Sequence, residues 1–175
     1  MHVTVFVAAT ADGFIARADG SLDWIPAPES GSHDFGFCDL IASVDAIVMG
    51  RATFDFVVGS GEWPYGDIPV IVLTNRDLSL PSGFPGRVDT AAGEVGVVAD
   101  QLSGRGLNAL YVDGADVIQQ FIRAGLIDRI IVTQIPVLIG SGIPLFGPID
   151  EDISLRLRRS SSYPNGWVQF DYEVG

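Results

Sequence analysis

The sequence predicts an α/β fold in which a mostly parallel central sheet is flanked by helices and ends in a C-terminal antiparallel hairpin. Three observations support this class. Apolar runs rich in β-branched residues recur along the chain, segments with helical spacing separate them, and the last segments alternate apolar with polar residues. Runs that are apolar at every position are typical of strands buried on both faces, as in a covered parallel sheet.

The apolar runs predict the central strands, and the spacing between them predicts the helices. The expected strands are residues 3–8, 46–49, 70–73, 109–112 and 129–135. The expected helices are residues 34–43, 51–58, 94–102 and 115–125. Because strands and helices alternate, right-handed crossovers joining parallel strands are expected.

The C-terminal part of the chain changes character. Residues 154–160 and 167–174 alternate apolar with polar side chains, which is typical of strands with one exposed face. Between them, Asn165-Gly166 is a strong turn signal. This hairpin is expected to close one edge of the sheet.

Length and composition indicate one domain spanning residues 1–175. The 175 residues are 47% hydrophobic and 18% charged, which is typical of a globular chain with a sizeable core. The Gly- and Pro-containing stretches at 59–69 and 81–86 are interpreted as connections within that domain. We find no internal repeat and no linker.

Charge narrows the classes of partner. A formal net charge of −12 argues against nucleic acid, whose phosphates require a basic surface. All ten basic residues are arginine, so Schiff-base chemistry and a lysine-dependent phosphate loop are excluded. A few arginines near one site would still suffice to hold an anionic cofactor.

Location is inferred from cysteine use and from hydrophobicity. Cys38 is the single cysteine and the start of the chain lacks a basic segment, which predicts a cytoplasmic protein. Residues 130–149 carry no charge, but three prolines and three glycines interrupt them. They are interpreted as a buried strand followed by a loop, with no association with a membrane.

Several common catalytic patterns are missing. The two histidines, His2 and His33, show no metal-ligand spacing with Cys38, so no metal is expected. There is no G-x-S-x-G elbow and no G-x-G-x-x-G after the first strand. Gly140-Ser-Gly142 follows a late strand and is a weak signal by itself.

The ends of the predicted strands carry the strongest functional signal. In open α/β sheets, ligands bind beyond the carboxyl ends of the strands. Here Gly50 would let a phosphate approach the backbone at a helix start, where Arg51 adds a cation and Thr53 a hydroxyl. Each such end alone can be an ordinary turn, but their combination predicts a bound dinucleotide.

These segments resemble the dihydrofolate reductase fold, and within it the reductase domain of bacterial riboflavin biosynthesis (the RibD C-terminal type) and its stand-alone relatives. The segments that carry the resemblance are residues 8–16, 44–54, 69–75, 110–122 and 126–146. The GR-x-T-F motif and the last of these segments are the most specific.

The resemblance implies NADPH as the cofactor. By position, it implies that the nicotinamide side is contacted by Ala9 and Ile15, and the pyrophosphate with its neighbouring phosphate by Gly50, Arg51 and Thr53. It implies that the adenosine half is contacted by Leu73, Thr74, Asn75 and Arg76. The residues expected to close over the diphosphate are Gly114, Ala115, Asp116 and Val117. Arg51 and Arg76 are the expected readers of a 2′-phosphate. The family often has two adjacent glycines where this chain has Gly114-Ala115, and Asp116 would repel a diphosphate.

On the substrate side the resemblance points to Asp34 as the catalytic, ring-binding carboxylate and to Trp24 as an aromatic near the substrate. The alternative is that Asp34 is a helix N-terminal residue favoured by the helix dipole. Asp12 could reach the nicotinamide side of the site, or belong to a plain turn.

The function predicted in this way is an NADPH-dependent reductase. Its substrate would be a small molecule, either a phosphoribosylaminouracil-like aminopyrimidine or a pterin, with dihydrofolate reduction proper as the alternative. The chain shows no zinc motif of the deaminase that accompanies the riboflavin reductase, which weakens that assignment. A nucleotide-binding dimeric domain without efficient turnover is the other alternative. The resemblance implies a homodimer, with residues 138–146 as a candidate interface.

Overall fold

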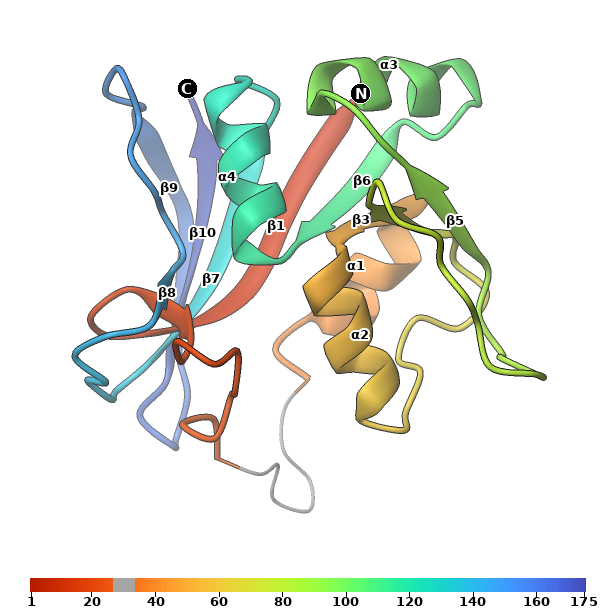
Figure 1. Cartoon of the computed structure of the whole chain (residues 1–175). Coiled ribbons are helices and arrows are strands. Elements are labelled where there is room, and N and C mark those ends of the chain that lie inside the picture. Colours follow the sequence, from red (N-terminus) through yellow and green to blue (C-terminus); the bar gives the residue numbers. More distant parts are fainter. Residues whose placement is uncertain (27–33) are drawn as a thin grey trace.

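The computed structural model describes residues 1–26 and 34–175, which form an eight-stranded sheet with helices on both faces (Figure 1). Its elements are β1 (His2–Thr10), β2 (Phe14–Ala16), α1 (Phe37–Ser43), β3 (Ala46–Gly50), α2 (Arg51–Gly59), β4 (Val70–Leu73), β5 (Val88–Ala91), α3 (Val95–Gly104), β6 (Ala109–Asp113), α4 (Ala115–Arg123), β7 (Arg129–Ile135), β8 (Ile143–Pro144), β9 (Leu155–Ser162) and β10 (Val168–Val174).

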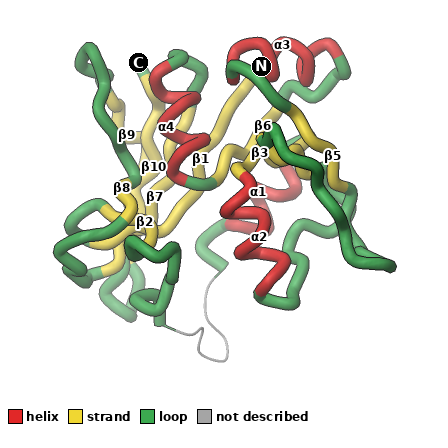
Figure 2. Tube along the Cα trace, viewed as in Figure 1, coloured by secondary structure: helices red, strands yellow, loops and turns green. Residues whose placement is uncertain are grey.

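The sheet has the strand order β5-β4-β3-β6-β1-β7-β10-β9. Pairing is parallel from β5 to β7 and antiparallel where β10 joins β7 and β9 joins β10. The predicted α/β class, with a mostly parallel sheet and an antiparallel C-terminal hairpin, is therefore confirmed. A separate two-stranded sheet of β2 and β8 lies beside the carboxyl end of β1 (Figure 2).

Two apolar layers explain why the central strands read as apolar at every position. On one face, Ala46 and Val48 of β3 pack in the layer that contains α3 and α4. On the other face, Ile47 and Met49 pack in the layer that contains α1 and α2. All four side chains are fully buried, so alternate residues of the same strand fill opposite layers of the core.

The join between β7 and the hairpin contains an ion pair. The guanidinium of Arg129 donates from Nε and Nη2 to the two carboxylate oxygens of Asp171, at 2.8 and 2.9 Å. Asp171 is only 6% exposed, and the hydrogen bonds from Arg129 lower the pKa of its carboxyl. The pair therefore fastens the antiparallel edge to the parallel part of the sheet.

The structure differs from the sequence prediction in a few elements. The helix predicted over 34–43 begins at Phe37, because Phe35 and Gly36 have positive φ angles of 55° and 89° and interrupt helical geometry. Strands β2, β5 and β8 were not predicted. Within the described residues, no helix is long and apolar enough to cross a membrane, and no cluster of His, Cys, Asp or Glu could hold a metal.

Candidate functional site

A cavity of about 830 Å³ lies where β3, β4 and β6 reach their carboxyl ends. One side is formed by the starts of α2 and α4. The opposite side is formed by β2 and the loop that follows it, with Ile15, Leu22 and Ile25 as its apolar surface. The cavity thus occupies the place that ligands take in open α/β sheets, and its size is within the range of small-molecule sites.

The starts of α2 and α4 converge at this cavity through their preceding glycines. A Cβ on Gly50 would lie 3.3 Å from Cγ2 of Val117 on α4. Gly114 has φ of 85°, and a Cβ there would overlap the hydroxyl oxygen of Thr53 on α2. Glycine is therefore required at position 114, and favoured at position 50, for the close approach of the two helix starts, which brings their first-turn N–H groups to one place.

These N–H groups form a fitting site for an anion. Neither Gly50 nor Gly114 provides a side-chain cap, and no side-chain cap is found for α2 or α4 within the described chain. Uncapped N–H groups at a helix start attract negative charge, since the helix dipole is positive there. Two such starts at one cavity suit a ligand with two adjacent phosphates.

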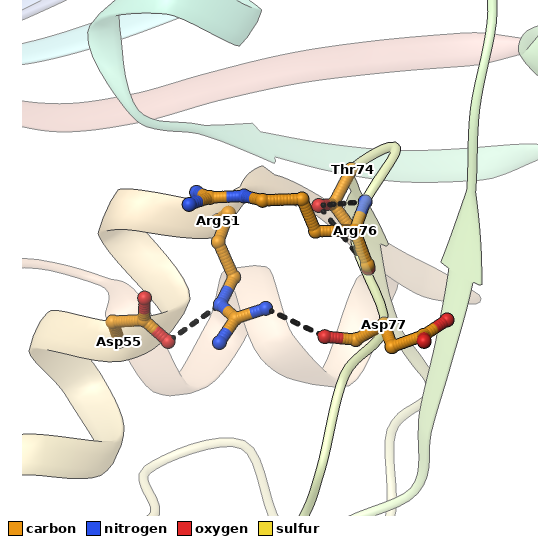
Figure 3. A network of polar contacts seen from close by, with 5 residues as sticks. All are labelled: Arg51, Asp55, Thr74, Arg76 and Asp77. Carbon is orange, nitrogen blue, oxygen red and sulfur yellow. Dashed lines mark hydrogen bonds and ion pairs between the residues drawn. The ribbon is translucent and has the colours of Figure 1, made fainter.

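Two arginines add positive charge at the same end of the cavity (Figure 3). Arg51 Nε donates to Oδ1 of Asp55 at 2.7 Å, and its Nη1 donates to the carbonyl of Asp77 at 3.2 Å. Arg76 follows β4, where the Thr74 hydroxyl accepts its backbone N–H at 3.1 Å, and its side chain extends toward α2. No ion pair to Arg76 is formed by the described residues, so its guanidinium is available to a ligand.

A carboxylic acid that the sequence analysis did not select lines the cavity at the end of β6. Asp113 ends β6, lines the cavity, and accepts a hydrogen bond from the N–H of Gly114 at 2.8 Å. Burial raises the pKa of the Asp113 carboxyl. Burial also raises the pKa of the nearby Tyr111 hydroxyl, which lines the cavity and donates to the carbonyl of Phe6 at 3.0 Å. A half-buried acid with a raised pKa in a cleft is a candidate for proton transfer.

Most of the predicted cofactor-binding residues come together here. The cavity is lined by Ile15, Gly50, Arg51, Thr53, Leu73, Thr74, Asn75, Arg76, Gly114, Ala115, Asp116 and Val117. The exception is Ala9, whose side chain lies in the core layer of α3 and α4, whereas that of Ala8 lines the cavity. The Asp116 carboxylate accepts a hydrogen bond at 2.8 Å from the side-chain amide of Gln120, one turn further along α4.

The predicted substrate residues do not line the cavity. Trp24 is buried, with 6% exposure. Asp34 accepts the N–H groups of Gly36 and Cys38 at 3.1 and 3.0 Å, and these bonds lower the pKa of its carboxyl. This is the helix-start arrangement that was the alternative interpretation of Asp34. The histidine next to it, His33, lies outside the described residues.

The strand order, the C-terminal hairpin and the cavity between two helix starts define a protein of the dihydrofolate reductase-like fold class. The chain belongs to the RibD C-terminal domain family, whose pattern matches residues 1–81 and 90–169. That family and its relatives place the chain in a superfamily of reductases.

Individual relatives differ in what is known of them. The chain is 32% identical to the uncharacterized protein YwjB of Bacillus subtilis, over 96% of this chain and 95% of that protein. It is 32% identical to the dihydrofolate reductase HdrB of Haloferax volcanii, over 70% of this chain and 62% of that enzyme. It is 29% identical to the riboflavin biosynthesis protein RibD of Corynebacterium ammoniagenes, over 81% of this chain and 45% of that protein.

The chain is also similar to solved structures over its whole length. A protein of Shewanella sp. PV-4, provisionally assigned to riboflavin biosynthesis, superposes with a TM-score of 0.90 and 36% identity. The match covers 100% of this chain and 99% of that one.

Proposed function

We propose that this protein is a single-domain, NADPH-dependent reductase that transfers hydride to a small aminopyrimidine-ribosyl or pterin substrate. The observation that carries the proposal is the convergence of two uncapped helix starts and two arginines at one cavity. This arrangement is suited to a dinucleotide diphosphate with an additional phosphate, which distinguishes NADPH from NADH.

The residues of the cavity fit such a cofactor from end to end. Gly50 and Gly114 would leave room for the diphosphate, with the backbone N–H groups of α2 and α4 as donors. The segment after β4 would hold the adenosine half, with the guanidinium of Arg76 on its 2′-phosphate. The apolar side around Ile15 would cover the nicotinamide, which supplies the hydride when it is bound.

Asp113 is the first candidate for the proton that must accompany hydride transfer to a C=N or C=O group. Burial raises its pKa, so the Asp113 carboxyl keeps its proton to a higher pH than an ordinary aspartate and is the better placed to donate it to a substrate nitrogen or oxygen. Asp34, with its lowered pKa and its bonds to backbone N–H groups, is the second candidate. A carboxyl that is already ionised is a poor donor at neutral pH.

Between the two substrate types, one observation favours a substrate without a phosphate. Among the described residues, the cations that line the cavity are Arg51 and Arg76, and both lie at the proposed cofactor end. A phosphorylated aminouracil would need a further cation at the substrate end. Dihydrofolate reduction is therefore the second candidate function, and the relationship to HdrB supports it.

The test is oxidation of NADPH, followed by its absorbance, with dihydrofolate and with the phosphoribosylaminouracil. The wild type is expected to turn over one of them, and Asp113→Asn is expected to retain NADPH binding while losing most of the turnover. Asp34→Asn serves as the comparison. A greater loss of turnover in Asp34→Asn than in Asp113→Asn would make Asp34 the proton donor instead. Binding of NADPH without oxidation in the presence of either substrate would instead support a nucleotide-binding domain.

We also propose that the protein is a cytoplasmic homodimer. Leu138 and Phe146, which flank β8, are 74% and 48% exposed, as expected for side chains that a partner covers. Light scattering with Leu138→Asp tests this surface, and a wild-type mass equal to one chain would contradict it.

A further inference from the structure

The Asp12 carboxylate joins two loops that lie far apart in the sequence. It accepts the backbone N–H groups of Ile139 at 3.1 Å and Gly140 at 2.8 Å, and it accepts the hydroxyl of Thr10 at 2.5 Å. These bonds lower the pKa of the Asp12 carboxyl, so it is ionised and forms charge-assisted bonds at neutral pH. Asp12 itself does not line the cavity.

The same contact explains the Gly140-Ser-Gly142 motif, which the proposed phosphate site does not use. Gly140 has φ of 73°, a left-handed conformation that glycine adopts readily, and its N–H points to Asp12. At Gly142, a Cβ would overlap the carbonyl oxygen of Ala16 in β2. Both glycines therefore allow the 137–142 loop to lie directly against the β1–β2 segment.

This junction supports the apolar side of the cavity. Next to Asp12, the N–H of Ala11 donates to Val137 at 2.9 Å, and the carbonyl of Gly13 accepts from Leu145 at 2.9 Å. Strand β2 then pairs with β8, and Ile15, Ala16 and Ile143 line the cavity. The surface proposed to cover the nicotinamide thus rests on two loops that Asp12 fastens together.

We propose that Asp12 is a positioning residue that sets the nicotinamide side of the site through the Gly140-Ser-Gly142 loop, and that it makes no contact with the cofactor itself. The inference rests on the proposed NADPH site. Its consequence is selective: loss of the clamp affects the nicotinamide half of the ligand, while the helix starts and arginines at the other end keep their geometry.

The test compares two ligands in the same titration experiment. Adenosine 2′,5′-bisphosphate lacks the nicotinamide half, so it reports on the Arg76 end and the adjoining phosphate site, whereas NADPH reports on the whole cavity. For Asp12→Ala, we expect the Kd of NADPH to rise about tenfold, the size of one charge-assisted bond, and that of the bisphosphate to change less than about twofold. Asp19→Ala is the matched control, since Asp19 lies in the same segment but accepts its hydrogen bond from the neighbouring Ser21 N–H and, within the described residues, does not join the two loops.

Two further variants keep the test decisive if Asp12→Ala does not fold. Asp12→Asn retains one acceptor oxygen and is expected to show a smaller loss of the same selectivity. Gly142→Ala displaces the loop from Ala16 without touching Asp12 and is expected to act like Asp12→Ala. If the Kd values of both ligands rise equally in a folded variant, or neither rises, Asp12 has no positioning role. If the wild type binds neither ligand, the proposed function fails and this inference fails with it.

Discussion

Replacing Gly114 with alanine tests the cofactor site at its tightest point. An alanine at φ of 85° costs about 1–3 kcal/mol in backbone strain, because L residues rarely adopt this conformation. Its Cβ would also overlap the Thr53 hydroxyl, and relieving such overpacking costs about 1–3 kcal/mol more. We therefore expect Gly114→Ala to lower the free energy of unfolding by about 2–6 kcal/mol in urea titrations.

The same substitution is expected to raise the Kd of NADPH more than tenfold in calorimetric titration, because it separates the starts of α2 and α4. Gly96→Ala is the matched control: Gly96 lies in α3 with open space around it, so alanine is expected to be neutral or stabilising by up to about 1 kcal/mol. In a Thr53→Ala background, Gly114→Ala should lose its steric cost and keep only its backbone strain. An undiminished cost in that background, or a stable Gly114→Ala protein with normal NADPH binding, would refute this account of the helix contact.

Three other outcomes are expected. Asp113 has a raised pKa in the folded protein, so the wild-type free energy of unfolding should fall as pH rises from near 3.8 through the folded pKa; Asp113→Asn should flatten this decline in urea titrations at several pH values. Arg129→Ala leaves the carboxylate of Asp171 buried without its partner and should lower the free energy of unfolding by about 2–3 kcal/mol in the same titrations. Arg156→Ala removes an exposed ion pair of the same hairpin and should lower it by less than about 1 kcal/mol. Equal losses in the two variants would contradict the role of burial. Arg76→Ala should raise the Kd of NADPH about tenfold and leave that of NADH nearly unchanged, and an equal effect on both would remove Arg76 from the 2′-phosphate.

How far the fold could be predicted depended on burial. Strands such as β3 and β4 are covered on both faces, so their whole length is apolar and easily recognised. Strand β5 lies at the sheet edge with Asp89 and Thr90 exposed, and nothing in its composition distinguishes it from a loop. Strands β2 and β8 have three and two residues and exist through their pairing with each other, which no local pattern encodes.

The candidate site shows a similar division. Gly50, Arg51 and Gly114 could be placed because ligand sites follow from strand ends, which the apolar runs indicate directly. Asp113 could not be selected, because its raised pKa depends on burial in three dimensions. Ala8 and Ala9 show a different limit: adjacent residues of a strand face opposite sides, so Ala8 lines the cavity while the side chain of Ala9 lies in the core, and the resemblance alone does not distinguish them.

The contacts of Arg51 determine how the site would meet a ligand. Its long side chain is already held by the Asp55 carboxylate and the Asp77 carbonyl, so the loss of rotamer freedom, about 1.5–2 kcal/mol for an arginine, is incurred on folding. A phosphate that arrives meets a rigid guanidinium whose charge is shared with Asp55. Arg51 therefore contributes shape more than net charge, and salt should weaken anion binding less through Arg51 than through Arg76, which forms no ion pair with the residues that the structure describes.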